Sequence, residues 1–225
     1  MSGFKNSILN RSVAQGILKD ILFKVLVCCE MMQNDCMAHC ITLNNLEEDI
    51  RDYLFANYLN SDDIMDQVGL SEFRFFSEVP ENYKNSKPKG RTDLQIISMN
   101  MFKQRKKYFT IECKRIDGSK LLNRYYIENG IKRFVLPNPL YPSAFATNCM
   151  FGFVVKNIDI DANTQKISKL QTDEYKDIGS KATFSYAGIS DKHKYTYKSE
   201  YFVKDAQDVL LYHVFYDFSS LIDSK

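Results

Sequence analysis

Two charged residues, Glu112 and Lys114, interrupt an apolar segment, FTIECKR, near the middle of the chain. Successive side chains of a β-strand point to opposite faces, so Glu112 and Lys114 share one face while Ile111 and Cys113 share the other. The apolar face can pack against a core. The other face carries a carboxylate and an ammonium group, and both charges need partners, which points to a chemical role.

A second carboxylate lies in the stretch GRTDLQIIS, where Asp93 is expected on the strand that precedes Glu112. Pairing of the two strands would place the carboxylates side by side, and adjacent carboxylates repel each other unless a cation lies between them. Mg²⁺ binds through one or two carboxylates and keeps waters, which suits a site that also holds a phosphate. Lys114 would orient the attacking water or stabilise charge on the phosphate. The sequence therefore predicts metal-assisted phosphodiester hydrolysis.

The pattern of Asp93 followed by Glu-Cys-Lys at 112–114 resembles the D…ExK core of the PD-(D/E)xK nuclease superfamily, which has the restriction-endonuclease-like fold. The resemblance spans about residues 43–155, and Thr92 stands where the named motif has proline. It implies an α/β fold with a mixed central sheet flanked by helices, and a Mg²⁺ cofactor for which Mn²⁺ can substitute. An N-terminal helical extension is expected in addition to this core.

This superfamily commonly adds a glutamate from a helix ahead of the sheet, and LNNLEEDIRDYL is the expected helix. Glu47 is the preferred candidate because it shares a helical stripe with Leu43 and Ile50, whereas Glu48 is turned about 100° away. The resemblance further implies that the backbone carbonyl of Cys113 contacts the metal, with the thiol of this residue facing the core.

Positive charge is concentrated around these residues. From Lys84 to Arg133 there are 14 Lys or Arg against 4 Asp or Glu, a balance of +10 in a chain of net charge +2, so the remainder carries −8. Either a nucleic-acid backbone or solvent can be the partner of such a region. The residues expected to contact phosphates are Arg91, Lys103, Arg105, Lys106, Lys107, Lys132 and Arg133.

Four further residues have less specific patterns. Glu78 is either a fourth acid of the site or an edge residue. Tyr125 and Tyr126 are close enough in sequence to stack on a nucleobase, although core packing is the commoner role of tyrosine in such a segment. His213, in a strand, is expected to be a packed core residue.

The favoured function is that of a DNA endonuclease, with RNA left open as a substrate. Restriction or phage defence in a prokaryote is the setting that analogy of fold suggests. The chain has no GxxxxGK[ST] loop, so an ATP-driven step would need an ATPase or helicase-type partner, and cutting of two strands would favour a homodimer. One alternative is a non-catalytic nucleic-acid-binding subunit of a larger complex. Another is a scaffold in which Glu112 and Lys114 form a simple ion pair.

Composition places these residues in a folded protein. With 225 residues, 44% of them hydrophobic, and only 9 Gly and 5 Pro, a single globular domain is expected. The N-terminus lacks the pattern of a secretory signal and Ile17–Met32 contains four charged residues, so a cytoplasmic protein without a membrane span is predicted. The six cysteines are then expected to be free thiols. The dense segment CCEMMQNDCMAHC lacks the two separated ligand pairs of a zinc site.

Hydrophobic periodicity predicts an antiparallel meander followed by a helical crossover to a parallel strand. Helices are expected at 11–33, from Asn44 or Asn45 to Leu59, at 121–135 and at 160–170, and strands at 72–83, 90–98, 108–115, 194–202 and 208–218, with a helix entering a strand at 144–157. The single domain, residues 1–225, is divided into an N-terminal helical extension (1–40), a catalytic core (41–155) and a C-terminal helix with closing strands (156–225).

Overall fold

A computed structural model of the chain describes residues 7–84, 87–99, 107–136, 139–141, 145–181, 184–203 and 207–223. Seven strands in these ranges form one sheet, in the order β1-β2-β3-β4-β7-β6-β5. Their bounds are β1 Phe73–Lys84, β2 Lys87–Ser98, β3 Phe109–Ile116, β4 Thr147–Val154, β5 Ser185–Tyr186, β6 Thr196–Tyr201 and β7 Val209–Asp217. The neighbours β3, β4 and β7 are parallel, and the other pairs are antiparallel, so the sheet is mixed as predicted.

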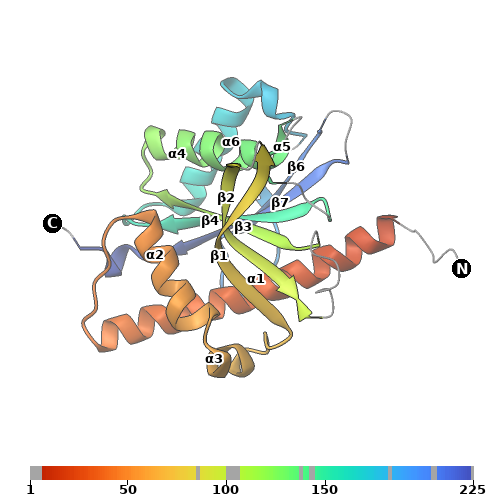
Figure 1. The fold of residues 1–225 in the computed structure, drawn as a ribbon. Helices are drawn as coiled ribbons and strands as arrows, with labels where there is room; N and C mark the ends of the chain where they lie inside the picture. The colour runs from red at the N-terminus through yellow and green to blue at the C-terminus, as the bar shows by residue number, and fades with distance from the viewer. Residues whose placement is uncertain are drawn as a thin grey trace, which may run out of the picture.

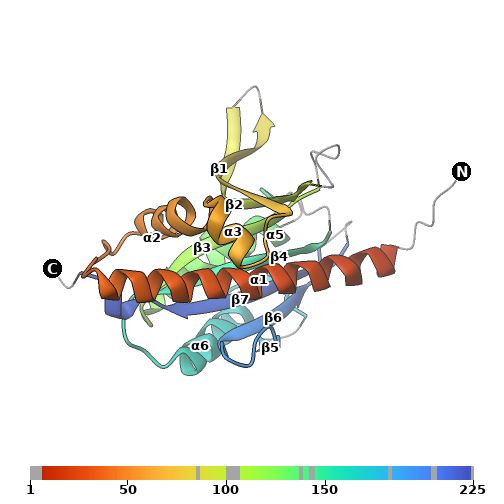
Figure 2. The same ribbon diagram turned by 90° about the horizontal axis from the view of Figure 1, so that it is seen from below.

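Helices cover both faces of the sheet (Figures 1 and 2). One layer contains α1 Ser7–Ala38, α2 Glu47–Leu54, the π-helical η1 Phe55–Leu59 and α3 Asp62–Gln67. The opposite layer contains α4 Lys120–Tyr126, the π-helical η3 Ile127–Ile131, α5 Lys132–Val135 and α6 Ile160–Asp173. Two short 3₁₀ segments follow, η4 Lys176–Ile178 and η5 Ser219–Leu221. The predicted α/β class with an N-terminal helix is confirmed.

Each helical layer has its own hydrophobic core against the sheet. On the α1 side, buried Leu22 and Val25 belong to the same cluster as Ile111 and Cys113 of β3. The second cluster lies on the side of α4, α5 and α6 and includes Met150 of β4. β3 therefore presents its apolar alternate residues to the α1 core, as its sequence predicts, and its other face to the α4–α5 layer. Within the described ranges, no helix combines the length and the hydropathy of a transmembrane segment.

All six cysteines are free thiols, as predicted. Cys28, Cys29 and Cys36 are buried on α1, and burial raises the pKa of Cys28 to about 12. A neutral buried thiol behaves as a small apolar side chain. No group of three or more His, Cys, Asp or Glu among the described residues is arranged to hold a metal ion.

The predicted loop between the first two strands is instead part of a long hairpin. The β1–β2 register continues as far as the pair Lys84 and Lys87. A polar sequence containing Pro88 predicts a loop, but Pro88 lies outside the short stretch of β2, Leu94–Ile96, that pairs with β3. Proline is tolerated there because no ladder hydrogen bond to β3 is required of it.

Two other element predictions need correction, and one helix was not predicted. The helix α2 begins at Glu47 with Leu46 as its N-cap, because the side chain of Asn44 donates a hydrogen bond to Asp49 (2.7 Å) rather than capping the helix. The short helix α3, capped by Ser61, is additional. No helix precedes β4 in the described residues 145 and 146. The predicted turn after β2 falls mostly on residues 100–106, outside the described residues.

His213 is a packed core residue, as expected. Its ring nitrogens lie 2.9 Å from the Tyr126 hydroxyl and 2.6 Å from the Ser199 hydroxyl, and its ring stacks on Phe184 at 4.0 Å. Burial lowers the pKa of His213 to about 3, so the imidazole is neutral in the folded protein. Tyr126 is held by the same network and is not available to a ligand.

The free energy of unfolding should therefore fall on acidification. The pKa of His213 is lowered by folding, so its contribution is fully present above its unfolded value of about 6.5 and is lost as the pH falls towards about 3. Between pH 7 and pH 5 this single group should cost about 2 kcal/mol. Urea denaturation at the two pH values measures it, and a His213→Gln variant, which has no group titrating there, should show a correspondingly smaller pH-dependent loss. An equal loss in both proteins would contradict the assignment.

Candidate active site

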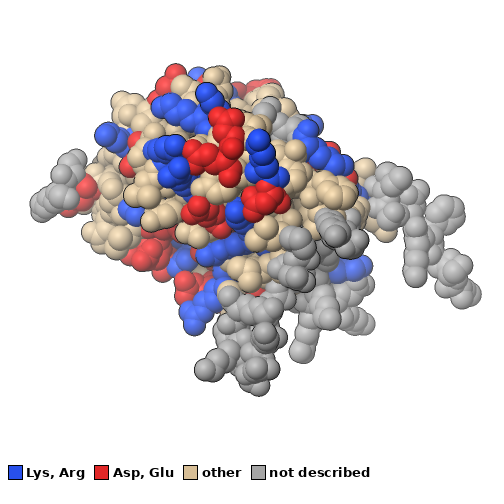
Figure 3. All heavy atoms as spheres, turned by 90° about the horizontal axis from the view of Figure 1, so that it is seen from above, with Lys and Arg blue, Asp and Glu red and all other residues tan. Residues whose placement is uncertain are grey.

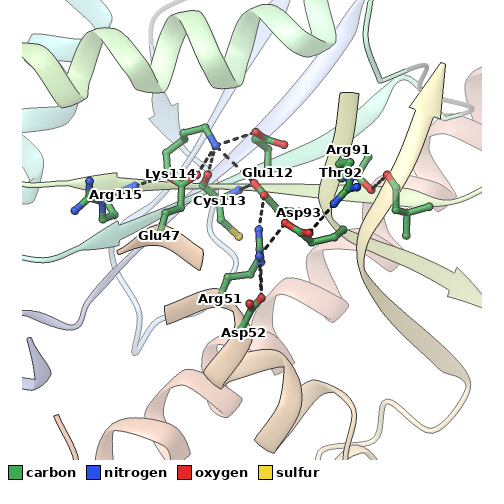
Figure 4. Close-up of polar contacts among 12 residues, drawn as sticks. Glu47, Arg51, Asp52, Arg91, Thr92, Asp93, Glu112, Cys113, Lys114 and Arg115 are labelled. Atoms are coloured by element: carbon green, nitrogen blue, oxygen red, sulfur yellow. Dashed lines mark hydrogen bonds and ion pairs between the residues drawn. The ribbon is translucent and has the colours of Figure 1, made fainter. Parts of the chain in front are cut away.

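Four charged residues predicted from the sequence meet at one point, where α2 approaches β2 and β3 (Figure 4). The Lys114 ammonium lies 2.7 Å from Glu47 Oε1, 2.9 Å from Glu112 Oε1 and 3.6 Å from Asp93 Oδ2. Glu47 comes from the first turn of α2, Asp93 from β2, and both Glu112 and Lys114 from β3. Three carboxylates from three segments thus surround one ammonium group.

Backbone contacts fix two of these carboxylates. Asp93 Oδ2 accepts a hydrogen bond from the Cys113 amide (2.7 Å), and Glu47 Oε2 accepts one from the Arg115 amide (3.0 Å). The Cys113 carbonyl accepts a hydrogen bond from Lys114 Nζ (2.5 Å), so this carbonyl faces the cluster while its thiol is buried in the α1 core. The predicted orientation of the Cys113 thiol is confirmed.

The cluster is buried to a degree that requires its charges to be paired. Glu112 is 0% exposed, Lys114 7% and Asp93 9%. Glu112 Oε1 accepts hydrogen bonds from Lys114 and from Arg133 Nη1 (2.6 Å). Its other oxygen, Oε2, is buried and has no hydrogen-bond partner among the described residues. A buried carboxyl oxygen without a donor can carry a proton when Glu112 is neutral, or contact a bound cation when Glu112 is ionised.

Arg51 completes the cluster and is not anticipated by the sequence analysis. It is 5% exposed, and its Nη1 lies 3.0 Å from Asp93 Oδ1 while its Nη2 lies 3.1 Å from Glu78 Oε1. Arg51 follows Glu47 by four residues, so the two lie on one face of α2. That spacing is the signal that would have identified Arg51 once Glu47 was chosen.

Glu78 belongs to the margin of the cluster. Its carboxylate contacts Arg51 and Arg91, and the structure gives it no ion pair with Lys114 in the described part of the chain. The Arg91 side chain is 61% exposed and lies beside Glu78 at 3.1 Å. Arg91 is therefore at the site and accessible to a phosphate.

The other predicted phosphate contacts divide into three groups. Arg133 contacts both Glu112 and the Tyr141 hydroxyl (2.5 Å), so much of its donor capacity is used within the protein. Lys132 points elsewhere, with Asp177 at 2.9 Å. Lys107 is exposed, whereas Lys103, Arg105 and Lys106 lie outside the described residues.

Charges on the outer side of α4 and α6 are mixed rather than uniformly basic (Figure 3). Lys120 and Arg124 both contact Glu174, at 2.7 and 2.5 Å. Part of the positive charge counted between Lys84 and Arg133 is thus offset by acids from later in the chain. The basic groups that face the cluster itself are Lys114, Arg51 and Arg133.

Electrostatics set the protonation state of the cluster. Burial alone would lower the pKa of Lys114, but Glu112, Asp93 and Glu47 together raise it above its ordinary value, so the ammonium stays charged. Burial and the neighbouring Asp93 raise the pKa of Glu112 to about 8, against the opposing effects of Lys114 and Arg133. Lys114 is consequently a hydrogen-bond donor and a cation, not a base.

The same geometry explains why these acids do not form a preassembled metal cage. No set of three or more acidic, His or Cys side chains in the described ranges has the arrangement of a metal site, and here the Lys114 ammonium lies between the carboxylates. The donors nonetheless suit a hard divalent cation: they are carboxylate oxygens and a carbonyl, with Glu112 Oε2 left without a partner. The oxygen donors of these residues are of the type that Mg²⁺ and Mn²⁺ bind.

Both helical segments that flank the cluster contain a π-helical turn. η1 continues α2, and η3 lies between α4 and α5. Such turns are rare and often occur at functional sites. η3 lies close to the sheet at Gly130, where a β-carbon would stand 2.2 Å from the terminal carbon of the flexible Met150 side chain. This close approach carries Arg133, one turn later, to Glu112.

Comparisons of the chain with protein-family models, with curated proteins and with solved structures find no match. A functional assignment therefore rests on the geometry and charge of the cluster.

Proposed function

We propose that the protein is a metal-dependent nuclease that hydrolyses phosphodiester bonds of nucleic acid, with DNA as the favoured substrate. The observation that carries the proposal is the convergence of Glu47, Asp93 and Glu112 on the Lys114 ammonium. A buried group of three carboxylates is costly to maintain for packing alone. The free-energy cost of burying these charges is explained if the acids hold a cation and the lysine contacts a substrate phosphate.

In this proposal Glu47, Asp93, Glu112 and the Cys113 carbonyl would hold Mg²⁺ or Mn²⁺. The bound ion would supply Lewis-acid polarisation of the phosphate and a lowered pKa for a ligated water. The mixed sheet, the helix that precedes it and the placement of Asp93 on β2 and Glu112 on β3 support the PD-(D/E)xK resemblance. A role in restriction or phage defence remains part of the proposal by analogy.

The roles of the side chains follow from their charges. Lys114, which stays protonated, donates hydrogen bonds to a phosphate oxygen and to the attacking water. Arg133 lies beside Glu112 and adds a second positive charge, and Arg51 holds Asp93 in place. Hydrolysis joins the oxygen of water to phosphorus and breaks one P–O ester bond. One fragment leaves with a hydroxyl group that takes one proton of the water, and the other is a phosphate monoester that takes the second.

The proposal predicts cleavage of DNA with Mg²⁺ or Mn²⁺ and none with EDTA. Supercoiled plasmid, linear duplex and single-stranded DNA are incubated with the protein, and products are separated on gels. Asp93→Ala and Lys114→Ala should each abolish cutting, because one removes a carboxylate of the cluster and the other its cation.

A matched control is Asp20→Ala, which removes an exposed carboxylate that pairs with Lys24 on α1 and should cut like the wild type. Asp93→Asn, which can still accept the Cys113 amide hydrogen bond, separates loss of charge from loss of fold. Wild-type protein that is folded, binds metal and cuts none of these substrates would contradict the proposal.

One observation favours a second candidate function. Lys114, Arg51 and Arg133 already offset the charge of the carboxylates within the protein, as a non-catalytic nucleic-acid-binding subunit would require. This alternative predicts binding of DNA, without metal-dependent cleavage, by the wild type and by every variant. In that case a partner subunit would supply the catalytic residues.

A further inference from the structure

A pocket of about 280 Å³ has Lys114 in its lining. It lies between the first turn of α2 and the helical segment α4–η3–α5, with β3 beneath. The residues that line it are Glu47, Glu48, Lys114, Arg115, Leu122, Tyr125, Asn129 and Arg133. The pocket meets the cluster at Glu47, Lys114 and Arg133, so its walls lie next to a phosphate bound there.

One wall of the pocket carries an aromatic ring that the core does not use. Tyr125 is 43% exposed and makes no hydrogen bond to another described residue. Its neighbour Tyr126 is fully buried and hydrogen-bonded to His213. The helix α4 thus buries Tyr126 and presents the preceding tyrosine to the pocket, where its partly exposed ring is available for stacking.

Both signs of charge line the pocket beside Tyr125, with three basic residues against Glu47 and Glu48. Lys114 and Arg133 line the same pocket, and Arg115 Nη1 is held in position by both the carbonyl and the side-chain oxygen of Asn45. A flat ring beside fixed positive groups matches the two chemical parts of a nucleotide, a base and a phosphate. This combination distinguishes the pocket from a general anion site.

We propose that Tyr125 stacks on one unpaired nucleobase adjacent to the scissile phosphate, and that single-stranded nucleic acid is therefore the preferred substrate. The inference rests on the proposed function for the identity of the neighbouring phosphate. In a duplex each base is paired and stacked within the helix, and moving it into a protein pocket costs free energy. An unpaired base reaches Tyr125 without that cost.

The test measures the affinity for DNA by fluorescence anisotropy. One labelled probe is an unpaired single-stranded oligonucleotide, and the other contains the same sequence paired with its complement in a hairpin duplex. Binding is measured in EDTA, and again with CaCl₂, so that it is read independently of cleavage. Tyr125→Ala should weaken binding of the single strand by about tenfold, whereas Tyr125→Phe, which keeps the ring, should stay within about twofold of wild type. Tyr186→Ala, which removes a tyrosine 54% exposed on β5, is the matched control and should have no effect.

Each outcome supports or overturns the inference. Preferential binding of the single strand that depends on the ring supports it. Unchanged affinity in Tyr125→Ala, or tighter binding of the duplex, overturns it. If binding depends on the ring but no DNA is cut, the proposed nuclease function is contradicted and this inference is not. If cleavage depends on Asp93 but Tyr125→Ala leaves both binding and cleavage unchanged, this inference is contradicted and the nuclease function is not.

Discussion

Replacement of Lys114 by methionine is expected to lower the free energy of unfolding by about 3–5 kcal/mol, because it leaves buried carboxylates without their shared cation. Methionine keeps the apolar length of the side chain, which is 8% exposed, so the loss reports charge rather than packing. Burial and Asp93 already raise the pKa of Glu112 to about 8, and removal of Lys114 raises it further. The deficit should therefore grow with pH, since Glu112 is neutral at low pH. Urea denaturation at about pH 6 and about pH 8.5 measures both effects.

A matched control is Lys120→Met, which breaks an ion pair of a lysine side chain that is 62% exposed and should change the free energy of unfolding by less than about 1 kcal/mol. Divalent metal supplies a second readout. If Lys114 occupies the place of a cation, Mg²⁺ or Mn²⁺ should stabilise Lys114→Met more than the wild type in a thermal melt. A Lys114→Met protein as stable as the wild type, and indifferent to metal, would contradict the electrostatic account of the cluster.

Glu112→Gln is expected to reduce the rate of cleavage by at least about a hundredfold while leaving the fold intact. The amide retains an oxygen that accepts from Lys114 and Arg133, but it cannot supply the negative charge that a metal requires. Single-turnover cleavage with saturating protein measures the chemical step, and anisotropy in EDTA confirms that substrate binding persists.

The stability of Glu112→Gln separates a catalytic role from a structural one. Because folding raises the pKa of Glu112, the stability of the wild type falls, relative to the Gln variant, as the pH rises from about 4.5 through about 8. Glu112→Gln should thus be relatively more stable at high pH and yet inactive. Glu174→Gln, at an exposed ion pair, is the control that should retain activity. Full activity in Glu112→Gln would contradict its role as a ligand.

The members of the cluster differ in how far sequence could place them. Glu112 and Lys114 follow from the alternation of one strand, and Asp93 from the pairing of its strand with β3, whose observed register, Leu94 opposite Ile111, brings it level with Glu112. Glu47 follows from a helical stripe. These are local patterns, or patterns one strand apart, and the structure brings the residues they identified together around the Lys114 ammonium.

The cations that complete the cluster depend on contacts between distant segments. Arg133 is expected from sequence to meet a phosphate, but it contacts Glu112 once η3 and α5 are packed beside β4. Arg51 reaches Asp93 only once α2 is docked on the sheet. Charge counting alone cannot tell which basic residues an acid from another segment will neutralise, as Glu174 does for Lys120.

Some predicted element boundaries were wrong because they also depend on contacts between distant segments. Pro88 suggests a loop, but the hairpin register decides that it lies in a strand. The two π-helical turns, at 55–59 and 127–131, give no periodic signal distinct from an α-helix. Their position next to the cluster is visible only in three dimensions.

The claim that Glu47, Asp93 and Glu112 hold a divalent cation is tested most directly by a crystal of the protein grown with MnCl₂ and measured for anomalous scattering of manganese. The account predicts one peak bounded by these three carboxylates and the Cys113 carbonyl, and its disappearance in Asp93→Ala. A wild-type crystal with the Lys114 ammonium still between the carboxylates and no manganese bound there would contradict it.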